Sequence, residues 1–226
     1  DMLVGKVLRS PYAHAKVLNI NIEEAEKIEG VEAIISYKDL PKHKFATAGH
    51  PWSLDPSHRD IEDRNILTDK ARFYGDAIVA VIATDEIIAQ RAIDLIKVEY
   101  EVLDFILKPE DAIREGAPII HEERPNNTLA SFGSESGNVE EDFKLAHKIY
   151  KDKFKTSMVH HCQMENHTAY SYVDGEGRVV IVSSTQIPHI CRRIIAQAFK
   201  LPFGKIRVIE PYLGGGFGSK QDVVVE

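Results

Sequence analysis

The segment that decides the fold runs from Val179 to Asp222 and reads VVIVSSTQIPHICRRIIAQAFKLPFGKIRVIEPYLGGGFGSKQD. It opens with a β-branched run that is typical of a strand, and Pro188 then stands where the first turn of a helix tolerates a missing N–H. Apolar residues recur on one side of that helix, at Ile190, Ile194, Ile195 and Ala198. A further strand, KIRVIEPYL, leads into the glycine-rich stretch LGGGFGSKQD at 213–222. This order predicts a mixed unit of strands and helices that ends in a loop.

The glycine-rich stretch does not have the spacing of a phosphate-binding loop. A P-loop needs a second glycine five residues after its first, followed directly by Lys and then by Ser or Thr. Here Ser219 stands five residues after Gly214, and Lys220 is followed by Gln221. A dinucleotide-binding fingerprint fits only loosely. The remaining interpretation from the residues alone is a turn that needs glycine for positive φ angles.

Gln186 lies in SSTQIPH, where the strand meets the helix. Loops at such junctions often contact ligands. A side-chain amide there can cap the helix, or it can donate one hydrogen bond to a ligand and accept another. Both interpretations remain open from the residues alone.

The first hundred residues alternate short strands and helices. GKVLRS and AKVLNINI alternate apolar residues and predict an antiparallel pair. A short helix at IEEAEKIEG ends at Gly30, and VEAIISY follows as a strand. Ile78 to Ala83 predicts a buried strand, and Thr84 or Asp85 caps the next helix. One face of that helix carries Ile88, Ala92, Leu95 and Ile96, and KVEYEVL is the next strand.

Two stretches break this pattern. Lys38 to Asn65 is rich in proline, histidine and charge and predicts a long surface excursion. Residues 108–141 mix Pro, Gly, Asn, Ser and acidic residues, which is typical of a linker. The predicted organisation is therefore a first domain at 1–106, a linker at 107–141 and the start of a second domain at 142–226. In the second domain, residues 147–184 predict two strands joined by the turn DGEG.

The stretch HHCQMENH contains residue types that bind zinc, at His160, His161, Cys162, Glu165 and His167. Adjacent residues of a strand point to opposite faces, and the spacing matches no common structural zinc site. Packed or hydrogen-bonded histidines are the favoured interpretation, with zinc as the alternative. Cys162 and Cys191 are the only cysteines and are expected to be reduced.

Composition excludes several classes of function. The formal charge of −7, with dispersed lysines and arginines, gives no footprint for nucleic acid. No apolar run approaches the length that spans a bilayer, and the N-terminal residues do not form a signal peptide. We therefore expect a cytoplasmic protein that binds neither nucleic acid nor membrane.

The segment at 179–222 resembles the molybdenum-binding subunit of the xanthine dehydrogenase and aldehyde oxidase family, most of all the bacterial xanthine dehydrogenase type. The resemblance rests on STQIP, a helix, LP followed by IRV, and GGGFG followed by a lysine. Upstream, LRSPYAHAKV, ARFYGDAIVAVIA and VEYEVL resemble the α/β hammerhead domain of the family, and QMENHTAYSYVD resembles the entry into its molybdopterin-binding domain. The resemblance implies an α+β fold with these two domains in that order.

The resemblance also implies a cofactor and a set of site residues. The metal would be held by the dithiolene of a molybdopterin, in cytosine or mononucleotide form, and not by protein side chains. Gln186 matches the glutamine that hydrogen-bonds an oxygen ligand of molybdenum. Phe217 and Gly218, with Gly216 in the same loop, match the residues that lie against the metal centre. The implied partners are subunits that carry 2Fe-2S clusters and FAD, for which this sequence has no motif.

The implied reaction is hydroxylation of an electron-poor carbon with water-derived oxygen. The base glutamate is expected beyond Glu226, so the resemblance implies an N-terminal fragment with no catalytic residue of its own. Gln221 is the expected substrate contact: the best-known purine hydroxylases have a glutamate there and a glycine at Ser219, whereas the bacterial subgroup with GGGFG-x-KQD uses the glutamine. A purine or related N-heterocycle is the expected substrate. The alternatives are an aldehyde or nicotinate-type hydroxylase subunit and a non-catalytic binding module of the same fold.

Overall fold

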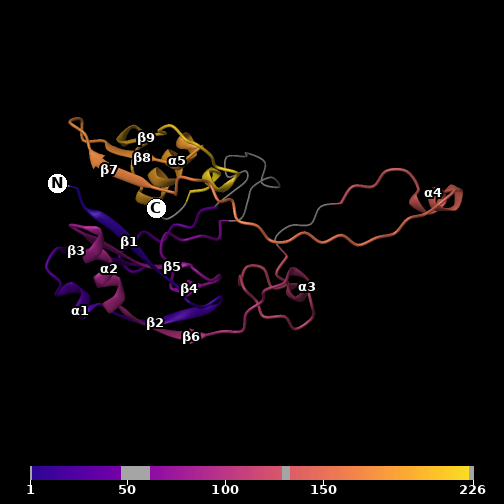
Figure 1. Cartoon of the computed structure of the whole chain (residues 1–226), viewed down its shortest axis with the longest axis horizontal. Helices are drawn as coiled ribbons and strands as arrows, with labels where there is room; N and C mark the ends of the chain where they lie inside the picture. Colours follow the sequence, from indigo (N-terminus) through magenta and orange to yellow (C-terminus); the bar gives the residue numbers. More distant parts are fainter. Residues whose placement is uncertain (1, 47–61, 129–132, 224–226) are drawn as a thin grey trace.

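The computed structural model describes residues 2–46, 62–128 and 133–223. Its body consists of an N-terminal unit (residues 2–46 and 62–104) and a C-terminal unit (residues 163–223), which lie one above the other in Figure 1. The fold is α+β, as predicted, and contains 3-stranded sheets in both units. Among the described residues, no helix combines the length and the apolar character that crossing a membrane requires.

The core of the N-terminal unit is built around strand β5 (Ala77–Ala83). β5 pairs antiparallel with β1 (Val4–Arg9) on one side and with β3 (Val31–Ser36) on the other. One face of β5 is fully buried and the other is buried or half-buried, which is why its sequence is a continuous apolar run. Ile78, Val79 and Val81 are fully buried.

Helix α2 (Glu86–Leu95) covers this sheet. The Asp85 side chain, one of the two predicted caps, accepts a hydrogen bond from the Ile88 N–H at 2.8 Å. The predicted apolar face is right at Ala92 and Ile96, which are buried, and wrong at Leu95, which is 44% exposed. The buried face is instead Ala89, Ala92, Ile93 and Ile96, since Ala89 and Ile93 complete the i, i+3, i+4, i+7 row.

The second sheet of the N-terminal unit contains β4 (Lys70–Ala71), β2 (Ala15–Asn21) and β6 (Lys97–Val102), in that order. The predicted antiparallel pairing of the first two strands is therefore wrong, because β1 pairs with β5 whereas β2 pairs with β4 and β6. The SPYAH connection between them leads from one sheet to the other. Short helix α1 (Glu23–Glu26) follows β2, and Gly30, at φ +92°, turns the chain into β3.

The C-terminal unit contains the sheet of β7 (Ala169–Val173), β8 (Val179–Ser183) and β9 (Ile206–Ile209). β7 and β8 form the predicted hairpin through DGEG, where the Asp174 N–H donates to the Arg178 carbonyl at 3.0 Å. β8 and β9 are parallel, so the chain needs a crossover between them. Helix α5 (Pro188–Phe199) and a 3-10 turn at Phe203–Lys205 supply it.

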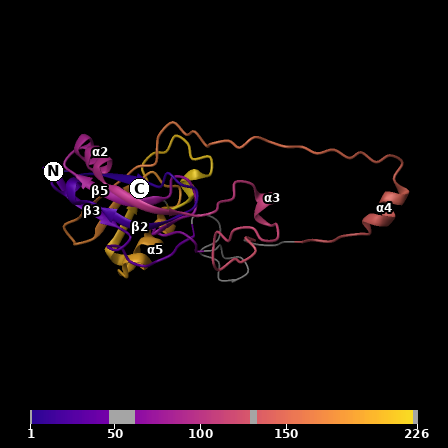
Figure 2. The ribbon, with the colours of Figure 1, turned by 90° about the horizontal axis from the view of Figure 1, so that it is seen from below.

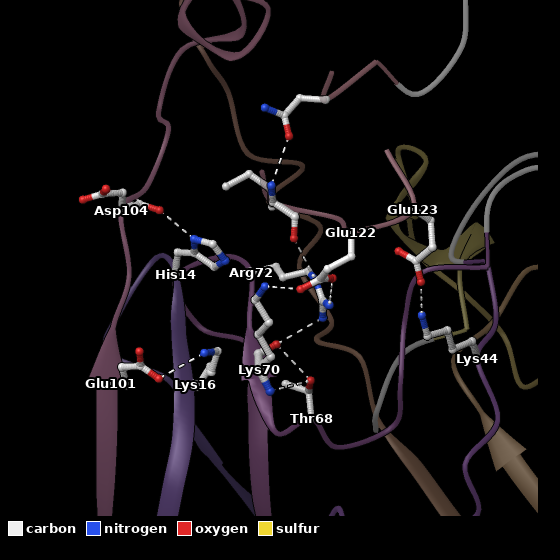
Figure 3. Close-up of polar contacts among 12 residues, drawn as sticks. His14, Lys16, Lys44, Thr68, Lys70, Arg72, Glu101, Asp104, Glu122 and Glu123 are labelled. Carbon is white, nitrogen blue, oxygen red and sulfur yellow. Dashed lines mark hydrogen bonds and ion pairs between the residues drawn. The ribbon is translucent and has the colours of Figure 1, made fainter. Parts of the chain in front are cut away.

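The segment that joins the two units is fixed to the N-terminal unit by ion pairs (Figure 3). After β6 the chain forms the short helix α3 (Pro109–Ala112). Glu122 then pairs with Lys70 and with Arg72, the latter at 3.0 Å, and Glu123 pairs with Lys44 at 2.6 Å. The Lys70 hydrogen bond is the main reason why the pKa of Glu122 falls to about 2.

Residues 133–162 are exposed throughout and extend far from the body (Figures 1 and 2). They contain helix α4 (Val139–Leu145), capped by the Asn138 side chain. The first strand predicted within 147–184 is therefore much shorter than expected, because only 169–173 form a ladder. Most of the excursion predicted from Lys38 to Asn65 lies outside the described residues.

Candidate functional site

The glycine loop follows β9 and closes on itself through Ser219. The Ser219 N–H and its hydroxyl both donate to the Gly216 carbonyl, each at 2.9 Å. Between them, Phe217 and Gly218 adopt positive φ angles of 49° and 93°. Such angles are costly for a residue with a Cβ and cluster at functional sites. A short 3-10 turn, Ser219–Gln221, ends the loop.

Glu165 contacts the start of the loop from a distant part of the chain. Its Oε1 atom accepts hydrogen bonds from the Gly214 N–H at 2.6 Å and from the Gly215 N–H at 2.9 Å. The Lys220 ammonium donates to the same oxygen at 2.9 Å. These contacts, the Gly215 N–H first and Lys220 next, lower the pKa of Glu165 to about 2. Glu165 is therefore a carboxylate at neutral pH.

Lys220 is the largest fully buried side chain among the described residues. A buried ammonium is costly unless a counter-charge lies next to it, and Glu165 supplies that charge. The backbone of Lys220 makes a second contact, because its carbonyl accepts from the Gln186 N–H at 2.8 Å. One residue therefore links Glu165 to Gln186.

Gln186 lies directly before α5, and its side chain rests against the glycine loop. A Cβ at Gly216 would lie 2.8 Å from the Gln186 Cδ and closer still to Oε1. Glycine is therefore required at 216 for this approach. The helix begins at an Ile187 N-cap without a side-chain hydrogen bond, so Gln186 does not cap α5. Of the two interpretations left open by the sequence, the structure is consistent with the ligand contact.

The residues around Gln186 are held by hydroxyl groups. The Thr185 hydroxyl accepts from the Ile187 N–H at 3.1 Å and lies 3.4 Å from the Cys191 sulfur. The Ser184 hydroxyl accepts from the Thr168 N–H at 2.9 Å. Ser184 and Thr185 are both buried. This polar network fixes the end of β8, and with it the backbone of Gln186.

The other predicted site residues lie on the exposed side of the loop. Phe217 is 73% exposed, and Gly218 and Gln221 are exposed as well. The structure thus brings Gln186 and Gly216 into contact and leaves the Phe217 ring, Gly218 and the Gln221 amide accessible. The roles assigned to them stay predictions.

The histidines and cysteine of HHCQMENH lie near one another at 160–162, where the His160 Nδ1 is 3.7 Å from the Cys162 sulfur. Within the described ranges, no group of three His, Cys, Asp or Glu side chains could hold a metal ion. Glu165 contacts the glycine loop instead, and the His167 Nε2 lies 3.3 Å from the Ser219 hydroxyl. Both cysteines are free, with Cys162 exposed and Cys191 buried.

A cavity of about 310 Å³ adjoins the loop. It is lined by β7, β8, β9 and α5, and also by Phe45 and Ile66 of the N-terminal unit and by Lys220 and Asp222. Burial raises the pKa of Asp222, and Arg64 of the N-terminal unit opposes this rise. The two units therefore meet at the loop that carries the predicted site.

Two residues of this arrangement were missed by the sequence analysis. Glu165 was considered only as a zinc ligand, and Lys220 only as the lysine of a P-loop pattern that fails at Ser219 and Gln221. Glu165 and Lys220 stand 55 residues apart, and no local pattern links positions at such a separation. The available signal was a lysine within a loop of small residues. If such a lysine is buried, its charge requires a partner of opposite charge.

Comparisons with known proteins agree on one family. The model of the aldehyde oxidase and xanthine dehydrogenase a/b hammerhead domain matches residues 1–104. The model of the molybdopterin cofactor-binding domain matches residues 120–226.

Individual relatives extend this similarity along the whole chain. A xanthine dehydrogenase molybdenum-binding subunit of Escherichia coli O157:H7 is 42% identical over 100% of this chain and 30% of its own length. A nicotinate dehydrogenase large molybdopterin subunit of Eubacterium barkeri is 36% identical over 100% of this chain and 50% of its own. The crystal structure of quinoline 2-oxidoreductase from Pseudomonas putida 86 has a TM-score of 0.83 at 25% identity, covering 99% of this chain and 28% of that one. This chain therefore spans half or less of the length of each.

Proposed function

The chain belongs to the aldehyde oxidase and xanthine dehydrogenase family, and on that premise we propose that it is part of the molybdenum-binding subunit of a purine hydroxylase. The observation that carries the proposal is the contact between Gln186 and Gly216, beside the exposed Phe217. The E. coli xanthine dehydrogenase relative, 42% identical, supports a purine or related N-heterocycle as the substrate.

The residues present fit a molybdopterin centre. Because Gly216 has no Cβ, the loop backbone and the Gln186 amide come together, and exposed Phe217 and Gly218 offer a ring and a bare backbone beside that amide. We assign cofactor contacts to Gln186, Gly216, Phe217 and Gly218, with Gln186 and Phe217 nearest the metal. When bound, the cofactor supplies the two-electron redox chemistry of the hydroxylation.

The protein residues would orient the cofactor and the substrate. The Gln186 amide donates one hydrogen bond and accepts another, which orients a polar ligand of the metal. Gln221, a neutral amide at the end of the loop, can pair with a donor and an acceptor on a heteroaromatic ring. The base that takes the proton would come from outside residues 1–226, as would most contacts to the pterin.

The wider assembly is also part of the proposal. Members of this family are multi-subunit enzymes that act on small molecules, and we assign to this chain partner subunits with 2Fe-2S clusters and FAD and a cytoplasmic location. The proposed organisation is a hammerhead domain at 1–106, a linker at 107–141 and the opening of the molybdopterin-binding domain from 142.

A second candidate, a nicotinate-type hydroxylase, is supported by the 36% identity to the nicotinate dehydrogenase subunit. Gln221 does not discriminate between the two, because an amide can face either ring system. The substrate therefore has to be identified by turnover.

The test uses the full-length subunit assembled with its partner subunits. Metal analysis should find molybdenum, and turnover should be measured with hypoxanthine, xanthine, nicotinate and aldehydes. We expect the fastest turnover with a purine. Faster turnover of nicotinate or an aldehyde would replace the purine assignment, whereas a subunit with neither molybdenum nor turnover would support a non-catalytic binding module.

A further inference from the structure

We infer that Glu165 is a positioning residue, which fixes the glycine loop through Gly214, Gly215 and Lys220 and thereby holds Gln186 against Gly216. The inference rests on the proposed function, because it concerns the same site. It adds a residue that lies outside the loop and outside the predicted cofactor contacts.

The first step is the convergence of donors on one atom. Glu165 Oε1 accepts from two consecutive backbone N–H groups and from the Lys220 ammonium, at 2.6, 2.9 and 2.9 Å. Hydrogen bonds to a carboxylate are stronger than those between neutral groups. Gly214 and Gly215 belong to no strand, so a ladder does not satisfy these N–H groups. Glu165 thus takes the place of a neighbouring strand.

The second step is the sequence requirement for this contact. A Cβ at Gly214 would lie 2.8 Å from Glu165 Oε2, so any other residue there would displace the carboxylate from this position. A Cβ at Gly215 would lie 3.0 Å from the Phe217 ring. Gly214 therefore allows the approach of Glu165, and Gly216 allows the approach of Gln186, whereas Gly215 leaves room for the Phe217 ring. The glycines form two contact surfaces on one loop.

The third step is the connection to Gln186. Lys220 binds Glu165 with its ammonium and binds the Gln186 N–H with its carbonyl. Because the Lys220 side chain is fully buried, the ammonium cannot exchange Glu165 for water without moving the loop. Loss of the Glu165 charge should therefore displace both the loop and the Gln186 amide. A displacement of about 1 Å at a reacting centre can cost about 100-fold in rate.

The test compares Glu165→Gln with a matched control in the full-length, assembled enzyme. Glu210→Gln removes the same charge four residues before Gly214, and the Glu210 side chain makes no hydrogen bond or ion pair with any described residue. The first readout is independent of activity: deuterium uptake of the peptide 213–221 should rise in Glu165→Gln and stay unchanged in Glu210→Gln. Unchanged uptake in Glu165→Gln would overturn the inference.

The second readout is turnover with xanthine. If another substrate of the panel is turned over faster, that substrate is used instead. Glu165→Gln should lower kcat about 10- to 100-fold at unchanged molybdenum content. In a double variant with Gln186→Ala the two losses should not multiply, because both act through one group. Losses that multiply would show that Glu165 acts independently of Gln186 and would overturn the inference.

The two variants distinguish a failure of the inference from a failure of the proposed function. If Gln186→Ala lowers turnover and Glu165→Gln changes neither turnover nor deuterium uptake, the inference alone is wrong. If neither variant changes turnover, the proposed role of Gln186 is wrong as well. Should Glu165→Gln not fold, Lys220→Met removes the other charge, and it should raise uptake of the same peptide; unchanged uptake there contradicts the inference.

Discussion

The largest fully buried side chain of the N-terminal unit is the apolar Ile78 of β5, whereas that of the C-terminal unit is the charged Lys220, ahead of Ile206 and Val180. The first unit packs β5 and α2 into one continuous apolar core. In the second unit, buried Ser184, Thr185 and Lys220 hold the segments around the loop through hydrogen bonds. The N-terminal unit is thus stabilised mainly by apolar burial, and the site mainly by polar contacts that fix geometry.

The largest expected effect comes from comparing the same substitution in the two units. Ile78 and Ile206 are 0% and 2% exposed, but only Ile78 belongs to the large core cluster. We expect Ile78→Ala to cost about 3–5 kcal/mol and Ile206→Ala about 2–3 kcal/mol, because the cost grows with the cavity left behind. Hydrogen exchange at increasing urea concentration, followed on peptides of each unit, measures the loss of stability in both variants. Equal losses would contradict the contrast between the cores.

A smaller effect is expected at the turn before β3. Gly30 has φ +92°, and a Cβ there would lie 2.6 Å from the Thr84 hydroxyl. Gly75 has nearly the same angle, +91°, with nothing within 4 Å of its Cβ position. Gly30→Ala should therefore cost about 2–3 kcal/mol and Gly75→Ala about 1 kcal/mol. Because the two glycines have nearly the same φ angle, the difference between the melting temperatures of the two variants measures the cost of the contact with Thr84. Identical melting temperatures would show that this contact costs nothing.

The smallest effect is expected where the connecting segment meets the N-terminal unit (Figure 3). Glu122 is 59% exposed, so solvent screens its ion pairs, and Glu122→Gln should cost less than about 1 kcal/mol at neutral pH. Its pKa is lowered from 4.5 to about 2. The stabilisation is therefore complete above pH 4.5 and is lost as the pH falls through about 2.

The measurement is the stability difference between wild type and Glu122→Gln across that pH range. The difference should shrink toward zero as the solution becomes acidic. Glu115→Gln, at a position without a hydrogen bond or ion pair to any described residue, is the matched control. A difference that does not change with pH would show that the ion pairs do not contribute.

Local signals predicted much of the fold. The Asp85 cap, the DGEG turn and Pro188 at the start of α5 all act within a few residues, and all were recognised in the sequence. The pairing of β1 and β2 was predicted wrongly, because adjacent strands usually pair and nothing in SPYAH shows that the chain changes sheets. The extended residues before β7 were predicted as a strand because their alternation is a property of the sequence, whereas a ladder also needs a neighbour.

The site was predictable only in part, because it too depends on contacts between segments that are distant in the sequence. The resemblance predicted Gln186 and the loop as parts of one site, and the structure brings Gln186 and Gly216 into contact. The contact of Glu165 with Gly214 depends on how residues 49 positions apart fold together. Burial of Lys220 likewise depends on tertiary structure, since the same lysine in an open loop would be solvated.

The central claim is that Gln186 and the glycine loop form one wall of a molybdenum site. Its most direct test is turnover by Gln186→Ala in the full-length, assembled enzyme, with Gln197→Ala, an exposed glutamine of α5, as the control. The account predicts that Gln186→Ala lowers kcat about 100-fold at unchanged molybdenum content and melting temperature, while Gln197→Ala matches wild type. Wild-type turnover in Gln186→Ala would contradict it.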